Sequence, residues 1–142
     1  MAIGPRTRVI VSVRNPYTRI VSALFTNSII NITFTPDKVY SALQRWVQTV
    51  NDNHTLPQSE FVVDALGNIV PNLCIVHQET LAEDMAKLGY TNFNVVENVN
   101  RKLPKAYYMN YLNADSITLI NTMYAKEFSM FGYDMILPKP QV

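Results

Sequence analysis

The sequence has little of several features that define common protein classes. It contains one cysteine, Cys74, among 142 residues, which excludes an internal disulfide and a cysteine zinc site. Its apolar stretches are short, as at residues 9–11, and far from the roughly 20 residues needed to span a bilayer. The first residues also lack the apolar core of a signal peptide. We therefore expect no disulfide scaffold and no membrane span in this chain.

Charge of either sign is also scarce. Twelve Lys and Arg against eleven Asp and Glu give a formal net charge of +1, and charged residues make up 16% of the chain. A general nucleic-acid binder usually carries a strong basic excess, so no nucleic-acid partner is expected. Apolar residues reach 48%, which argues against disorder, because disordered chains are poor in apolar residues and rich in charge. This balance still allows one small anion-binding pocket.

The length predicts a single domain over residues 1–142, since domains commonly have about 150 residues. No repeat or low-complexity tract interrupts it. The proline-containing segment 136–142 is expected to form a loose tail, as chain ends often do.

The first part of the chain predicts one strand and two helices. Residues 8–13 are rich in β-branched side chains and nearly continuous in apolar character, which is typical of a buried parallel strand. Asn15 and Pro16 then form a favourable helix start, with a helix expected from Pro16 to about Ile30. Thr35 and Pro36 repeat this signature and predict a second helix that ends near residue 50.

The second part predicts shorter elements. Residues 61–64 and 69–76 flank Gly67 and Asn68 and indicate a small hairpin or two short strands, the second of them delayed by Pro71.

The remainder of the chain predicts two more helices. A capping-box pattern at residues 80–83 predicts a helix that ends at Gly89. A short strand is expected at residues 93–96, a polar aromatic-rich loop at 97–112, and one helix from Asn113 to Gly132. The overall pattern is mixed α/β, with more helices than strands.

The segment that follows the first strand carries the clearest chemistry. Arg14 ends the strand, and a helix N-terminus follows at once, where free amide groups and the positive end of the helix dipole favour an anion. Arg19 and Ser22 are three residues apart and therefore share one helix face. Two guanidinium groups and a hydroxyl at such a junction suit a phosphate. The alternative is a helix start beside two solvated arginines, and the residues alone leave both interpretations open.

A resemblance favours the phosphate. The segment from Arg14 to Phe25 reads Arg-Asn-Pro-Tyr-x-Arg-x-x-Ser-x-x-Phe. It resembles the 3′-phosphate-binding motif of sulfotransferases that use 3′-phosphoadenosine 5′-phosphosulfate (PAPS). In that family an Arg and a Ser eight positions apart hold the 3′-phosphate, which implies Arg14 and Ser22 here. Arg19 matches the second arginine of the motif and is implied as a further cofactor-binding residue.

Four later segments resemble the carbohydrate, membrane-associated branch of the same family, so that the resemblance covers residues 8–135. They are the His-x-x-Pro-Gln element at residues 54–58, an Asp-x-x-Gly-x-Ile hairpin at 64–69, a Glu-x-Leu-x-x-Asp helix start at 79–84, and a sequence close to the terminal Tyr-x-x-Asp-Phe-x-x-Phe-Gly-Tyr at 124–133.

The resemblance implies an α/β fold of the P-loop kinase-like, three-layer sulfotransferase type, rich in helices. The family also has an upstream strand, a Pro-Lys-x-Gly-x-Ser/Thr loop that holds the 5′-phosphosulfate, and a helix. None of the four glycines of this sequence lies in such a loop. We therefore expect a partial domain, truncated at its N-terminus. Its unpaired sheet edge would favour self-association or pairing with another chain.

The implied function is transfer of a sulfuryl group from PAPS to a hydroxyl, on a carbohydrate or another hydroxyl acceptor, with release of 3′-phosphoadenosine 5′-phosphate (PAP) and no metal. His54 is the candidate base for the acceptor proton, with a loop histidine bonded to backbone as the alternative. Arg101, Lys102 and Lys105 form a candidate cofactor or acceptor loop, or else a solvated basic loop. His77 is expected to be structural.

Two other functions stay open at this point. One is a non-catalytic PAP-binding or assembly module derived from a sulfotransferase. The other is a kinase relative, which is disfavoured because no phosphate loop or Mg²⁺ carboxylate pattern is present in the sequence. A complete chain of this kind would be cytoplasmic, whereas part of a longer eukaryotic-type family member would lie in the Golgi lumen.

Overall fold

A computed structural model describes residues 6–49, 53–93 and 105–139 of the chain. Two compact units divide it: Met1–Arg14 with Gln58–Glu97, here the first unit, and Asn15–Pro57 with Asn98–Val142, here the second unit. The single domain expected for residues 1–142 stays a prediction, because compactness does not test whether the units fold independently.

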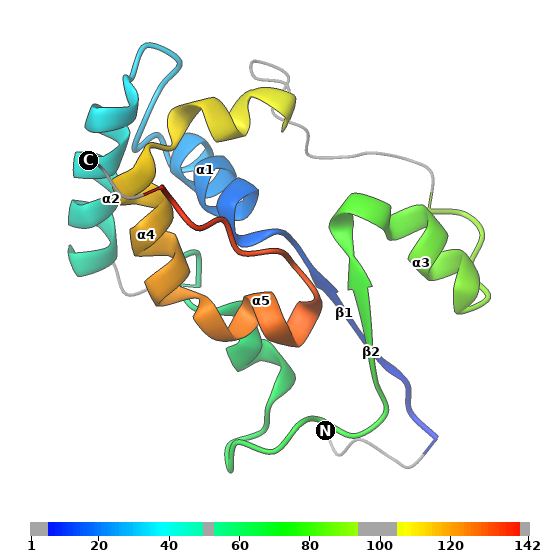
Figure 1. Cartoon of the computed structure of the whole chain (residues 1–142). Coiled ribbons are helices and arrows are strands. Elements are labelled where there is room, and N and C mark those ends of the chain that lie inside the picture. The colour runs from blue at the N-terminus through cyan, green and yellow to red at the C-terminus, as the bar shows by residue number, and fades with distance from the viewer. Residues whose placement is uncertain (1–5, 50–52, 94–104, 140–142) are drawn as a thin grey trace. The chain divides into compact units, whose positions relative to one another are not determined.

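The first unit contains a parallel pair of strands, β1 (Val9–Val13) and β2 (Leu73–His77) (Figure 1). Val9 pairs with Leu73 at one end and Val13 with His77 at the other. The parallel strand predicted at residues 8–13 is confirmed. Its burial is only partial, since Val13 is buried but the rest of β1 is half-buried or exposed. Each strand has one edge without a strand partner among the described residues.

The segment between the strands differs from the predicted hairpin. Gln58–Val62 form a 3₁₀ helix, η1, so the strand expected at residues 61–64 is wrong apart from one antiparallel bridge between Val63 and Ile69. The turn itself is present: the Asp64 carboxylate accepts hydrogen bonds from the Leu66 and Asn68 amides, both at 2.9 Å. The delay caused by Pro71 is confirmed, because β2 begins at Leu73.

A short 3₁₀ turn, η2 (Gln78–Thr80), links β2 to helix α3 (Leu81–Lys87). The helix ends as predicted, with Gly89 at a φ of +95° that favours glycine. The expected capping box is wrong in one respect, because the Thr80 side chain makes no cap hydrogen bond. Phe93 is not part of a strand, and the rest of the strand predicted at 93–96 lies outside the described residues.

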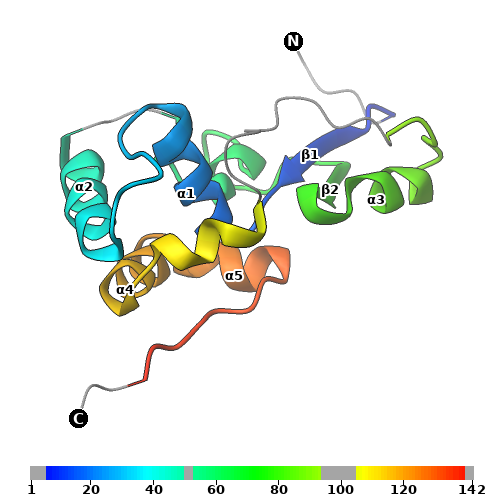
Figure 2. The same ribbon diagram turned by 90° about the horizontal axis from the view of Figure 1, so that it is seen from above.

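The second unit is helical. Helix α1 packs against the 3₁₀ helix η3 and helix α4, and α2 packs against the same two elements (Figures 1 and 2). The elements are α1 (Pro16–Thr26), α2 (Pro36–Thr49), η3 (Lys105–Tyr111), α4 (Ala114–Met123) and α5 (Ala125–Phe131). Mixed α/β structure is thereby confirmed, while the three-layer sulfotransferase fold stays a prediction.

Helix α1 begins as predicted but ends early. The Asn15 side chain accepts a hydrogen bond from the Tyr17 amide at 3.0 Å, and Pro16 is the first helical residue. The helix stops at Thr26, four residues before the predicted end. Asn27 donates its side-chain amide to the Ala23 carbonyl at 2.8 Å, which satisfies a carbonyl of the last turn.

The C-terminal part also departs from the prediction. Lys105–Tyr111 form η3, so the loop expected over 97–112 is wrong there, and residues 97–104 lie outside the described part of the chain. The single helix expected from Asn113 to Gly132 is two helices, broken at Tyr124, whose backbone leaves the helical region. Its ends are confirmed: the Asn113 side chain caps α4, and Gly132 closes α5 at a φ of +75°.

The segment after α5 is tied to the helices at Ile136. Tyr17 accepts a hydrogen bond from the Ile136 amide, and Asn121 donates one to the Ile136 carbonyl, both at 2.7 Å. Burial raises the pKa of Tyr17, and this amide bond opposes the rise. The loose tail predicted for 136–142 is therefore held at its first residue, and residues 140–142 lie outside the described part. No helix among the described residues could cross a membrane.

One apolar core fills the second unit, and α1 and α2 each contribute four of its buried residues. The buried members are Tyr17, Ile20, Val21, Leu24, Ile30, Val39, Ala42, Leu43, Trp46, Tyr108, Leu112, Ile120, Tyr124 and Phe128.

Truncation of this core tests the packing. Leu24 has no exposed surface, so Leu24→Ala should lower the free energy of unfolding by about 2–5 kcal/mol, measured by denaturant titration. Leu137 is 78% exposed and is the matched control, for which Leu137→Ala should change stability by less than about 0.5 kcal/mol. Equal effects of the two substitutions would contradict the described core.

Candidate functional site

Arg14 directly follows β1, and its backbone is held by one side chain. The Arg14 amide donates to Gln58 Oε1 at 2.8 Å, and Gln58 Nε2 donates to the Arg14 carbonyl at 2.8 Å. Gln58 is only 7% exposed, so this two-point contact is shielded from water. Arg14 itself is half-buried, with its Nη2 atom buried. The contact fixes the backbone of the first residue of the predicted phosphate site.

Gln58 is a residue that the sequence reasoning did not identify as functional. The only feature of the sequence that could have pointed to Gln58 is its position at the end of the His-x-x-Pro-Gln element. The resemblance located the element but gave no role to its glutamine. In the structure, the Gln58 side chain binds the backbone of Arg14, the residue that follows the end of β1.

The α1 N-terminus has the properties expected of an anion site. Asn15 occupies the cap, and no acidic side chain lies in the first turn of the helix. Its positive dipole end is therefore not offset by a carboxylate of that turn. Ser22 is half-buried further along α1. Arg14 belongs to the first unit and Ser22 to the second, so their joint contact with one phosphate stays a prediction.

Arg19 is placed differently from a solvated arginine. Its Nη2 donates to the Leu56 carbonyl at 2.7 Å and to the Asn53 carbonyl at 3.3 Å. Its Nη1 lies 4.0 Å from Glu127 Oε1, and its side chain is 15% exposed. The guanidinium carbon also lies 5.7 Å from the centre of the Tyr124 ring, within cation–π range. These contacts join Arg19 to other parts of the second unit, and its predicted contact with the cofactor stays untested.

Tyr124 and Glu127 complete this cluster from the C-terminal helices. The Tyr124 hydroxyl donates to the Thr55 carbonyl at 2.7 Å. Burial raises the pKa of Tyr124 to about 12, with the Arg19 charge opposing that rise and the Glu127 charge adding to it. Glu127 has no exposed side-chain surface. Both residues belong to the segment at 124–133 that resembles the terminal family motif.

The other predicted site residues are placed as follows. His54 is exposed in the loop of residues 53–57, and its role as a base stays a prediction. Lys105 begins η3, but its side chain lies outside the described part of the structure, as do Arg101 and Lys102 entirely. Within the described residues, no three His, Cys, Asp or Glu side chains are grouped as a metal site would require.

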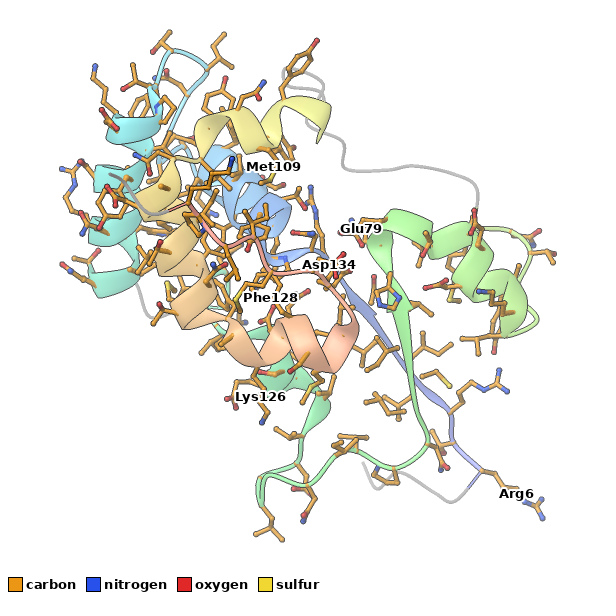
Figure 3. The ribbon with its side chains drawn as sticks, in the orientation of Figure 1. Arg6, Glu79, Met109, Lys126, Phe128 and Asp134 are labelled. Carbon is orange, nitrogen blue, oxygen red and sulfur yellow. The ribbon has the colours of Figure 1, made fainter. Side chains whose placement is uncertain are left out.

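His77 ends β2 and pairs with Asp84 of α3. The Asp84 carboxylate accepts a hydrogen bond from the His77 amide at 2.8 Å, and the same oxygen lies 3.0 Å from His77 Nδ1. Both contacts hold the pKa of Asp84 below its ordinary value, and the hydrogen bond from the His77 amide has the larger effect. The pair fixes the turn from β2 into α3, where Glu79 is exposed (Figure 3). This geometry supports the structural role expected for His77.

Comparison of the chain with family models, with curated proteins and with solved structures finds no match.

The His77–Asp84 contact predicts a defined pH dependence. Because the pKa of Asp84 is lowered in the folded state, its stabilising contribution is complete above the ordinary value of 3.8 and is lost as the pH falls through the folded value. Asp84→Asn should therefore destabilise the chain at pH 7, and its deficit relative to wild type should shrink as the pH falls below 3.8. Glu83→Gln, at an exposed acid of the same helix turn, is the control. Urea unfolding at several pH values measures both, and a deficit that grows on acidification would contradict the assignment.

Proposed function

We propose that this chain is the PAPS-binding part of an α/β sulfotransferase that transfers a sulfuryl group to a hydroxyl, with a carbohydrate as the favoured acceptor. One observation carries the proposal: a parallel strand, Arg14, an Asn cap and a helix N-terminus follow one another without interruption. In open α/β sheets, ligands bind at the carboxyl ends of the parallel strands. This order is what the resemblance to the 3′-phosphate motif requires.

Arg14 and Ser22 are the proposed ligands of the 3′-phosphate. The guanidinium of Arg14 can form two parallel hydrogen bonds with phosphate oxygens, and the amides at the start of α1 supply further donors. Gln58 supports this role because it fixes the Arg14 backbone at both its amide and its carbonyl. That Arg14 and Ser22 bind the same phosphate rests on the sequence motif alone.

The proposed reaction is an in-line transfer. The acceptor hydroxyl oxygen forms a bond to sulfur while the bond from sulfur to the bridging phosphate oxygen breaks, and PAP leaves. The acceptor gives its proton to a base, for which His54 is the candidate. Such transfers depend mainly on positioning and on stabilising spread negative charge. The 3′-phosphate site contributes the positioning, whereas a Pro-Lys-x-Gly-x-Ser/Thr loop for the sulfate end is not found in this sequence.

A non-catalytic PAP-binding or assembly module is the second candidate. The observation that favours it is the two-stranded parallel sheet, since parallel sheets are ordinarily covered on both faces and paired at their edges. Among the described residues, β1 and β2 each leave one edge without a strand partner. A second chain could pair there without any catalytic step.

Calorimetric titration with PAP tests the cofactor site. Arg14→Ala should weaken binding by about ten- to a hundredfold, because a hydrogen bond to a charged group contributes about 1.5–3 kcal/mol. Ser22→Ala should weaken it by less, since a neutral hydroxyl contributes about 0.5–1.5 kcal/mol. Arg45 is exposed on α2 and provides the control, Arg45→Ala, with unchanged affinity.

A second ligand isolates the 3′-phosphate. Adenosine 5′-monophosphate lacks that group, so wild type should bind it more weakly than PAP, and Arg14→Ala should reduce this preference. A folded wild-type chain that binds neither nucleotide would contradict the proposal. Sedimentation would then decide whether the chain self-associates, as the assembly module requires.

A further inference from the structure

We infer that Arg19 is a positioning residue, which holds the loop of residues 53–57 against α1 and α5, and does not bind the cofactor. The loop carries His54, so the consequence for catalysis rests on the proposed function. The structural part of the inference stands on contacts within the second unit alone.

Two side chains bind the carbonyl groups of this loop. Arg19 Nη2 donates to the carbonyls of Asn53 and Leu56, and the Tyr124 hydroxyl donates to the carbonyl of Thr55 that lies between them. Carbonyl groups in an irregular segment lack the regular backbone hydrogen bonds of a helix or sheet and need other donors. Here α1 supplies one donor side chain, and the residue between α4 and α5 supplies the other.

The charge of Glu127 accounts for the presence of an arginine at this position. Glu127 has no exposed surface, and removing a carboxylate from water costs several kcal/mol unless a positive group compensates it. Arg19 Nη1 is buried 4.0 Å from that carboxylate. One guanidinium therefore faces the carboxylate with Nη1 and binds the loop carbonyls with Nη2. A lysine ammonium has no such fork.

The same contacts make Arg19 a poor phosphate ligand. To bind a phosphate through both Nη atoms, the guanidinium would have to give up the 2.7 Å bond to Leu56 and turn away from Glu127. The nearby carboxylate would also repel the incoming anion. Only 15% of the Arg19 side chain is exposed to solvent. Geometry and charge both favour the internal role.

His54 benefits directly from this arrangement. The carbonyl before it, from Asn53, is bound by Arg19, and the carbonyl after it, from Thr55, is bound by Tyr124. The backbone that carries the imidazole is thus held on both sides, although the residue itself is exposed. A proton acceptor must be positioned closely, because a misplacement of about 1 Å can cost about a hundredfold in rate.

Hydrogen exchange of the full chain without ligand tests the contact itself. Arg19→Gln combined with Glu127→Gln removes both charges together, so that no buried carboxylate is left uncompensated. We expect amide exchange of residues 53–56 to rise at least about tenfold, while exchange of the α2 amides stays as in wild type. Arg19→Lys in the wild-type background keeps a positive charge on a single ammonium group. Its exchange in residues 53–56 should lie between that of wild type and that of the charge-neutral variant. Arg45→Gln is the matched control and should change neither segment.

Tyr124→Phe keeps the inference falsifiable if the charge-neutral variant does not fold. It removes only the hydroxyl that binds the Thr55 carbonyl and should raise exchange in the same loop. An unchanged loop in a folded Arg19 variant would overturn the inference. So would a rise of equal size throughout the chain, because that would report general destabilisation.

PAP titration separates this inference from the proposed function. The charge-neutral Arg19 variant should bind PAP within about twofold of wild type, whereas Arg14→Ala should not. If Arg19 variants lose PAP affinity as Arg14→Ala does while the loop keeps its protection, Arg19 is a cofactor ligand and the inference fails. If wild type does not bind PAP, the proposed function fails, and the exchange result alone still decides whether Arg19 holds the loop.

Discussion

The buried carboxylate of Glu127 is the constraint around which the polar part of the second unit is arranged. A charged group without solvent contact is tolerated only when opposite charge and hydrogen-bond donors surround it. Arg19 supplies the opposite charge from α1, with Nη1 4.0 Å from Glu127 Oε1, so the pair joins α1 to α5. The guanidinium then has further donors, and the loop of residues 53–57 uses them. The buried Glu127 carboxylate and its partner Arg19 thus connect α1, α5 and the loop of residues 53–57.

Local signals in the sequence predicted the first strand and several helix ends. The Asn15-Pro16 pair, the Asn113 cap and the glycines at 89 and 132 each act within a few residues, and each does what its chemistry requires. Ile20 and Leu24 are four residues apart, as on one helix face, and both are fully buried. Caps and periodicity are short-range, which is why they can be recognised without knowing the tertiary structure.

Two of the errors, at residues 61–64 and at Tyr124, fall where the structure has contacts between residues far apart in the chain. Nothing near Tyr124 predicts the break between α4 and α5, yet its hydroxyl reaches the Thr55 carbonyl, 69 residues away. The 3₁₀ helix η1 includes Gln58, whose side chain binds the Arg14 backbone 44 residues earlier. Contacts from a side chain to a distant carbonyl have no period in sequence. Propensity alone therefore gave a strand at residues 61–64 and one continuous C-terminal helix.

The same distinction explains how far the candidate site could be predicted. A motif places Arg14, Arg19 and Ser22 in one line of sequence and gives all three the same ligand. Tertiary contacts separate the two arginines: the Arg14 backbone is clamped by Gln58, whereas the Arg19 side chain is engaged by carbonyls and a carboxylate. Arg19 Nη2 would have to leave the carbonyls of Asn53 and Leu56 before it could bind a new anion, and that loss would subtract from its affinity. Two like residues of one motif can therefore lie in different surroundings, and a shared motif does not by itself give them a shared ligand.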